Sequence, residues 1–195
     1  MNVDRLLPLA RAVRNAKSLQ AAARAALALA ASLRQDLRTL FELDQRAPKE
    51  ALLLRVLGLP LELSAAGETV LALSVARAFL FAARPELSGD IAVILAHAGR
   101  RAEALAQLEA NLESAPNPYV AEAKAGDTYR ALGELDAAEA YYRRALAVAN
   151  ESDRSEAVLR ITSFLLDSGR DADADAFVKA QAPSRNSVGE PDPKH

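Results

Sequence analysis

The sequence contains no cysteine and no tryptophan, and aromatic residues make up only 5% of its 195 residues. Without cysteine, the chain has no disulfide, no thiolate nucleophile and no cysteine-ligated zinc. The scarcity of aromatic and β-branched residues argues against an all-β fold, because these side chains favour strands. Alanine and leucine are abundant instead, within a hydrophobic content of 51%. This composition predicts an all-α protein whose helices pack through small side chains.

A charge excess and a long apolar run are also missing. The formal net charge of -2 gives no electrostatic reason to bind nucleic acid or an acidic membrane surface. The longest apolar stretch, from Val70 to Ala83, is interrupted by Ser74 and Arg77 and is shorter than the roughly 20 residues that span a bilayer. Asp4 lies where a secretory signal needs apolar residues. We therefore expect a cytoplasmic chain with no membrane partner.

Three glycines recur at an almost constant spacing in the second half of the chain. Gly99, Gly133 and Gly169 are 34 and 36 residues apart. Each follows an apolar helical run and precedes a charged residue and an alanine-rich helix. A period of this length is typical of stacked helical hairpins, in which a single hairpin cannot bury both of its faces.

The middle unit shows why this spacing suits packed helices. Gly126 and Ala138 are expected to leave room for a neighbouring backbone, while Tyr129 and Tyr142 fill the remaining gaps. Gly133 is expected to end the first helix in the left-handed conformation. The residues that we expect to pack the repeats are Gly99, Ala104, Gly126, Tyr129, Gly133, Ala138, Tyr142, Ala145, Gly169 and Ala174.

The start of the second helix of the middle unit also has a sequence signal. Asp136 and Glu139 have the spacing of an N-cap residue and its capping-box partner. We therefore expect this helix to begin after Asp136.

These units resemble the tetratricopeptide (TPR) repeats, a family of helical hairpins with a period of about 34 residues. About three repeats cover roughly half of the chain. Glu122 and Ser88 depart from the family pattern, because a large aromatic residue usually stands at their positions. The resemblance implies a right-handed solenoid of helical hairpins. The signature positions of the middle unit are held by Ala125, Gly126, Tyr129, Ala138, Tyr142 and Ala145.

The chain is expected to divide into three regions. Residues 1–84 form an N-terminal helical cap, and Gly67 allows one further degenerate repeat whose first helix Pro60 interrupts. Residues 85–183 contain the TPR-like repeats, and residues 184–195 are polar with two prolines and are expected to be disordered. In the cap we expect helices over residues 3–16, 19–43, 50–57 and 68–83.

The resemblance implies a non-catalytic interaction or scaffold module with no cofactor and no metal. A protein or peptide partner would lie in the concave groove formed by the first helices of successive repeats. Aligned positions place Val93, Asp127, Arg130 and Ser163 on this groove. The apolar N-terminal helices also leave a homodimer open.

Two features could suggest more specific chemistry. His97 stands near an expected helix end with no serine, aspartate or glutamate constellation around it in sequence, so we assign it no catalytic role. Asp171, Asp173 and Asp175 resemble the start of a calcium loop, but Ala176 stands where that loop needs glycine. Acidic residues that open a helix explain the three aspartates better.

A DNA-binding regulator is the alternative function. Residues 18–40 loosely resemble bacterial helix-turn-helix segments, and residues 1–46 carry eight basic against four acidic residues. Salt-dependent duplex binding would distinguish this function. The turn would fall on residues 26–30, however, where Ala-Leu-Ala-Leu-Ala are all strong helix formers. We therefore expect one long helix in this segment, and we do not expect the chain to bind nucleic acid.

Overall fold

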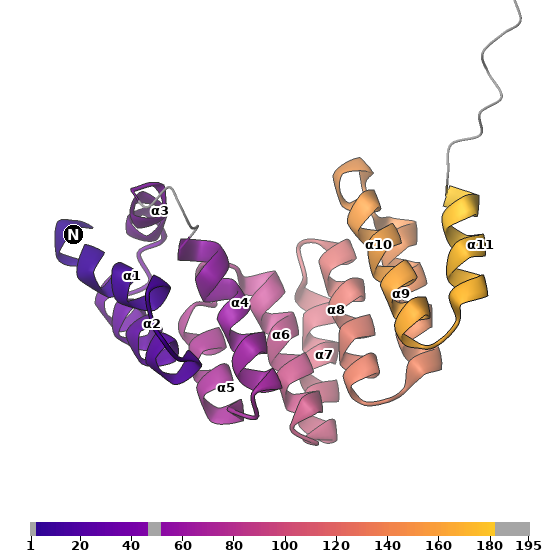
Figure 1. The fold of residues 1–195 in the computed structure, drawn as a ribbon, viewed down its shortest axis with the longest axis horizontal. Coiled ribbons are helices and arrows are strands. Elements are labelled where there is room, and N and C mark those ends of the chain that lie inside the picture. Colours follow the sequence, from indigo (N-terminus) through magenta and orange to yellow (C-terminus); the bar gives the residue numbers. More distant parts are fainter. Residues whose placement is uncertain (1–2, 47–51, 182–195) are drawn as a thin grey trace, which may run out of the picture. The chain divides into compact units, whose positions relative to one another are not determined.

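The computed structural model describes residues 3–46 and 52–181. In these ranges the protein is all-helical and has no strand, which confirms the predicted all-α class (Figure 1). The predicted disordered tail at residues 184–195 lies outside the described residues. A short 3-10 helix, Val3–Arg5, precedes α1 (Leu7–Arg14), α2 (Leu19–Leu33), α3 (Leu37–Gln45), α4 (Leu52–Ala65), α5 (Thr69–Ala78), α6 (Arg84–His97), α7 (Arg101–Ser114), α8 (Pro118–Ala131), α9 (Leu135–Val148), α10 (Glu151–Asp167) and α11 (Asp171–Gln181).

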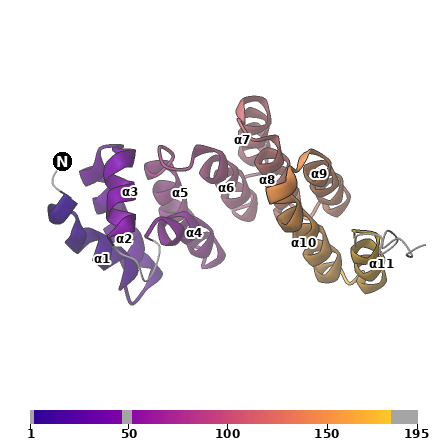
Figure 2. The same cartoon turned by 90° about the horizontal axis from the view of Figure 1, so that it is seen from above.

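The chain forms two compact units, Met1–Val148 and Ala149–His195. In the first unit, helices pack mainly against their neighbours in sequence, and α4, α6 and α8 also contact one another in that order. Figures 1 and 2 both show α6 beside α8. In the second unit, α10 packs against α11. Successive hairpins of the first unit therefore contact one another through their first helices, and α5 and α7 also contact the first helix of the next hairpin.

The same glycine turn closes four hairpins. In each turn the glycine has a positive φ and its N–H donates to the carbonyl three residues earlier, while the next N–H donates to the carbonyl five residues earlier. This is the Schellman motif, which satisfies carbonyls at a helix end. The prediction for Gly133 is confirmed, and the turn recurs with φ values of 79°, 72°, 77° and 70° at Gly67, Gly99, Gly133 and Gly169.

A buried alanine follows each of these glycines by five residues. Ala72, Ala104 and Ala138 are fully buried, and Ala174 is 2% exposed. A small side chain at this point lets the second helix of the hairpin approach its neighbours closely. The expected packing role of Ala104, Ala138 and Ala174 agrees with this burial, and Gly67 with Ala72 extends the pattern into the N-terminal region.

The close contact between α8 and α9 depends on Gly126. A Cβ atom at this position would lie 2.4 Å from the ring of Tyr142, which is 1% exposed. Ala145, one turn further along α9, is also buried. Tyr129 behaves differently from the expectation, because it is only half-buried and stacks on Tyr141 with ring centroids 5.1 Å apart.

The expected capping box at the start of α9 is wrong. The helix begins at Leu135, and the N–H of Ala138 donates to the carbonyl of Glu134. Asp136 therefore lies in the first helical turn, where the positive end of the helix dipole stabilises its negative charge. Glu139 accepts hydrogen bonds from Arg143 at 3.0 and 2.7 Å instead of reaching back to a cap.

Pro60 does not interrupt its helix as expected. The helix α4 runs continuously from Leu52 to Ala65 with Pro60 buried inside it. Val56, Leu59 and Leu63 are all fully buried, so one apolar stripe continues through the proline. The free energy gained by burying this stripe outweighs the cost of the backbone hydrogen bond that the proline nitrogen cannot donate. The following helix, α5, is shorter than expected and ends at Ala78.

The single helix expected over residues 19–43 is also wrong, because the chain turns between α2 and α3. Arg34 and Gln35 have φ values of 49° and 64°, and Asp36 caps α3 by accepting the N–H of Thr39 at 3.1 Å. Leu33 and Leu40, on either side of the turn, are both fully buried. Burial on both helices therefore offsets the cost of two left-handed residues that are not glycine.

Candidate functional site

A hollow of about 410 Å³ lies across the first helices of three successive hairpins. It is formed by α4, α6 and α8, which contact one another in that order. Two of its lining residues come from α4, two from α6 and three from α8. The lining residues are Leu61, Ala65, Val93, His97, Asp127, Arg130 and Ala131.

The lining residues occupy equivalent positions of the three hairpins. Leu61, Val93 and Asp127 each stand six residues before the turn glycine of their hairpin. Ala65, His97 and Ala131 each stand two residues before it and are the last residues of their helices. The same two positions therefore recur along one face, and each hairpin contributes one pair to the hollow.

The floor of the hollow is aliphatic and its rim is polar. Val93 is 6% exposed, and Leu61 is half-buried. His97 and Arg130 are exposed at the rim. Because all three helices end here, their C-termini bring carbonyl groups and the negative ends of their dipoles to this side. The arrangement suits an apolar side chain held between hydrogen-bonding groups.

Asp127 is held in place by its neighbours in the first unit. Its carboxylate accepts a hydrogen bond from the hydroxyl of Tyr142 at 2.8 Å and lies 4.0 Å from the amine of Lys124. Tyr142 is buried, so this bond also satisfies a hydroxyl group that water cannot reach. Asp127 therefore links the hollow to the packing of α8 against α9.

Lys124 makes a buried ion pair with Asp90 between α8 and α6. The side chains are 17% and 6% exposed. Burial raises the pKa of Asp90 above its ordinary value of 3.8, while the charge of Lys124 and its hydrogen bond oppose that rise. The stem of Lys124 crosses Gly89, where a Cβ atom would lie 2.4 Å from Cγ of the lysine. A larger residue at position 89 would therefore displace the stem of Lys124 that reaches Asp90.

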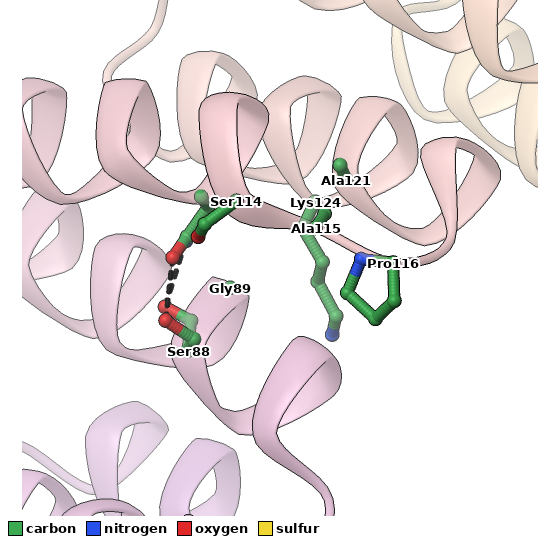
Figure 3. Close-up of a pocket in the computed structure, with 8 residues that line it drawn as sticks. Ser88, Gly89, Ser114, Ala115, Pro116, Ala121 and Lys124 are labelled. Carbon is green, nitrogen blue, oxygen red and sulfur yellow. Dashed lines mark hydrogen bonds between the residues drawn. The ribbon is translucent and has the colours of Figure 1, made fainter.

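A smaller hollow of about 240 Å³ lies where α6, α7 and α8 meet (Figure 3). Ser88 on α6 and Asn111 on α7 are joined through a side-chain hydrogen bond, and the amide of Asn111 donates to the Ser88 carbonyl at 2.9 Å. Gln107 donates to both side chains. Because these polar groups bond to one another, the walls of this hollow need no ligand to satisfy them.

His97 and Ser64 form a contact near the larger hollow that pairs a histidine with a hydroxyl group. Nδ1 of His97 lies 3.4 Å from Oγ of Ser64, which is long for a hydrogen bond. Ser64 is buried and does not line the hollow. Helix C-termini offer carbonyls rather than the N–H donors that stabilise an oxyanion. Of this pair, His97 lines the hollow and Ser64 does not.

Three of the four residues assigned to the partner groove lie together. Val93, Asp127 and Arg130 line the same hollow, whereas Ser163 lies half-buried on α10 in the second unit. The sequence interpretation missed the contribution of α4, because the expected break at Pro60 removed that helix from the repeat pattern. The signal that could have found Leu61 is its distance from Gly67.

The segment that resembles a helix-turn-helix does not turn where that motif requires. Residues 26–30 lie inside α2, and Ala26 and Leu29 are fully buried. The observed turn at Arg34 and Gln35 is followed by α3, whose exposed residues include apolar, basic and acidic side chains.

Further features of the described residues complete the picture of the site. No group of three or more histidine, cysteine, aspartate or glutamate residues in these ranges is placed to hold a metal ion. Asp171 and Asp173 open α11, as the helix-start interpretation predicts, and Asp173 accepts a hydrogen bond from Arg170 at 2.7 Å.

Within the described ranges, no helix has the length and apolar character that crossing a membrane requires.

Comparisons with known proteins add no family assignment. Neither a family model nor a curated protein matches the sequence.

Proposed function

We propose that the chain is a non-catalytic protein-interaction module, built as a TPR-like solenoid of helical hairpins. Its partner is a protein or peptide segment that lies across α4, α6 and α8. The partner places an apolar side chain against Leu61 and Val93 and hydrogen-bonding groups near His97 and Arg130. The resemblance of three hairpins to TPR repeats supports this architecture, and the recurring glycine turn extends the repeat to a fourth hairpin.

The observation that carries the proposal is the register of the hollow. Equivalent positions of three successive hairpins, six and two residues before the turn glycine, meet in one hollow of about 410 Å³. A surface that repeats in this way matches the regular spacing of side chains along an extended or helical segment. An isolated pocket for a small molecule would not need the same two positions from each hairpin.

The test substitutes one residue that lines the hollow and leaves the buried core unchanged. Ala65→Arg places a long side chain into the hollow from the exposed C-terminal end of α4. The negative end of the helix dipole also stabilises a positive charge there. Ala66→Arg is the matched control, because Ala66 is exposed next to it and does not line the hollow. Asp127 is left unchanged because it accepts a hydrogen bond from the buried Tyr142, so its substitution would also disturb the packing of α8 against α9.

The measurement is affinity capture from the native organism, followed by a titration of each captured protein against the purified chain. The proposal expects a stoichiometric partner that binds the wild type and Ala66→Arg alike and binds Ala65→Arg at least about tenfold more weakly. Equal affinity for both variants, or the absence of any stoichiometric partner, contradicts the proposal. Circular dichroism and urea unfolding show whether both variants keep the wild-type fold.

A further inference from the structure

A separate hollow of about 490 Å³ lies between α7 and the pair α8 and α9. Its walls are apolar, with leucines from α7 facing two stacked tyrosines. Two glutamates of α7 stand at its rim. The lining residues are Leu105, Leu108, Glu109, Leu112, Glu113, Tyr129 and Tyr141. None of them lines the hollow of the proposed function.

This hollow is the open side of a small apolar core. Ala92, Leu108 and Ala125 are buried, whereas Leu112 and the two tyrosines are only partly buried against them. The other hairpins close the equivalent position, which stands four residues before the turn glycine. Tyr129 holds it here and is half-buried. Its counterparts are at most 4% exposed, and they are Leu63, Leu95 and Leu165.

The rim of this hollow carries two negative charges that the described residues do not neutralise. Glu109 and Glu113 are exposed, one helical turn apart on α7, and neither has a hydrogen bond or ion pair within the described part of the chain. Like charges at this spacing repel each other. Arg144, which lies over the ring of Tyr141, is paired with Glu122 at 3.1 Å. The rim therefore suits a cation from outside the molecule.

The chain itself exposes a complementary surface on α3. Leu37 and Phe41, one turn apart, are 37% and 43% exposed. Phe41 is the only exposed phenylalanine among the five in the sequence, all of which lie in the described residues. Arg38 lies beside them and has no side-chain partner within the described ranges. Glu42 lies on the same surface, next to Phe41. The exposed ring of Phe41 matches the apolar hollow, and Arg38 is the cation that can meet its acidic rim.

We propose that a second copy of this chain inserts the exposed face of its α3 into this hollow. Phe41 packs against the leucines of α7 and the ring of Tyr129, and Arg38 lies against Glu109 and Glu113. The chain's own residues 182–195 fit less well, because they contain no phenylalanine, tyrosine or tryptophan to fill the hollow. The two contact surfaces differ, so the junction is heterologous.

The first experiment measures the mass of the full-length chain by analytical ultracentrifugation from micromolar to millimolar concentration. Self-association of the wild type is expected. Both Phe41→Gln and the double variant Glu109→Lys/Glu113→Lys are expected to weaken it by at least about tenfold, because they remove the ring and reverse the rim. Glu42→Gln is the control on α3 and leaves association equal or stronger.

A mixing experiment tests the heterologous geometry. Phe41→Gln retains the hollow, and Glu109→Lys/Glu113→Lys retains the α3 surface, so an equimolar mixture contains one intact kind of junction. The mixture is expected to form a 1:1 dimer that does not grow further. Asp136→Lys/Asp175→Lys makes the same change in net charge at exposed positions outside the hollow, and it is expected to associate like the wild type.

Three results overturn the proposal. The first is a wild-type chain that stays monomeric over the whole concentration range. This result overturns the proposal even where the hollow of the monomer binds a basic amphipathic peptide. Another is self-association that both interface variants leave unchanged while they keep wild-type circular dichroism. The last is a mixture that shows no dimer. The Ala65→Arg variant is expected to self-associate normally, so failure of the proposed function is distinguishable from failure of this inference.

Discussion

At the scale of single residues, the closest packing in the first unit depends on glycines that meet side chains of α8 and α9. At Gly126 the neighbour is the rigid, buried ring of Tyr142, and at Gly89 it is the aliphatic stem of Lys124. Gly58 differs, because a Cβ atom there would lie 3.7 Å from the end of the Glu62 side chain. Three helical glycines of similar appearance in the sequence therefore have different structural roles.

Substitution of Gly126 by alanine is expected to destabilise the protein by about 1–3 kcal/mol, because a buried ring must move to admit the methyl group. The same change at Gly58 meets only ordinary contact and improves helix propensity, so it is expected to stabilise by about 0.5–1 kcal/mol. Urea unfolding of both variants gives the comparison. A neutral Gly126→Ala would contradict the close contact with Tyr142.

A second residue-scale prediction concerns the buried pair of Lys124 and Asp90. The folded state binds a proton on Asp90 more tightly than the unfolded state, because the pKa of the folded group is raised above 3.8. Its contribution to stability therefore falls as pH rises from about 3.8 to the raised value. Lys124→Met removes the opposing charge, so it raises the pKa of Asp90 further and widens this window.

We expect Lys124→Met to cost about 3–5 kcal/mol at neutral pH, since it leaves a buried carboxylate unpaired. The loss is expected to shrink towards pH 4, where Asp90 takes up a proton. Urea unfolding of variant and wild type between pH 4 and pH 7 measures the difference. A loss that does not depend on pH would contradict the stabilisation of the Asp90 carboxylate by the charge of Lys124.

At the scale of elements, each hairpin is closed by a turn that is complete within its own sequence. A methyl group added to any of the turn glycines would have no atom within 4 Å, so crowding does not explain these residues. Their positive φ values explain them, because alanine is strained in this conformation while asparagine tolerates it better. Local sequence is therefore enough to place these turns.

For this reason Gly133→Ala is expected to destabilise the protein by about 1–2 kcal/mol. Gly133→Asn should retain part of that stability, because asparagine is the second choice at this helix-capping position. Thermal unfolding of the two variants gives the order. Equal stability of the alanine and asparagine variants would contradict a conformational role for this glycine.

These turns were predictable from sequence, whereas two other element boundaries were not. Gly133 has a local signal because few residues adopt its φ. Pro60 predicted a break that the structure does not have. Burial of the surrounding leucines keeps α4 continuous, and that burial is visible only in the fold. Arg34 and Gln35 gave no signal, because neither residue favours the left-handed conformation. The cap formed by Asp36 and Thr39 was the available evidence for the turn.

At the scale of the whole molecule, burial differs between the two compact units. In the described part of Ala149–His195, only five apolar residues are buried, and they are Ala157, Ile161, Phe164, Leu165 and Ala174. In Met1–Val148 one apolar core extends from Val3 to Ala104 and includes residues of α1 through α7. The two units therefore differ in how much apolar burial opposes their opening.

Hydrogen exchange is expected to reflect this difference. Amides of α10 and α11 should exchange faster than those of α4 and α6, because fewer buried contacts must break to expose them. Exchange followed by mass spectrometry resolves the helices separately. Equal protection across α4, α6, α10 and α11 would contradict the prediction.

The candidate site was predictable only in part, because it is built from contacts between different hairpins. Val93 and Asp127 could be aligned because their hairpins carry clear repeat signals, and the structure brings them into one hollow with Arg130. Leu61 and Ala65 come from α4, whose repeat signal is weak around Pro60. Which helices contact one another across hairpins depends on tertiary packing, and no spacing along the chain encodes it alone.

The recurring turn has a consequence for how this chain can change in length. Gly99 and Gly133 sit in the same local geometry, 34 residues apart, with equivalent neighbours before and after them. Loss or duplication of the intervening 34 residues would rejoin matching ends, whereas loss of a few residues would rotate every later helix out of register. In the proposed solenoid, the chain would therefore be lengthened or shortened by whole repeats of 34 residues, and each added repeat would bring its own pair of contact positions.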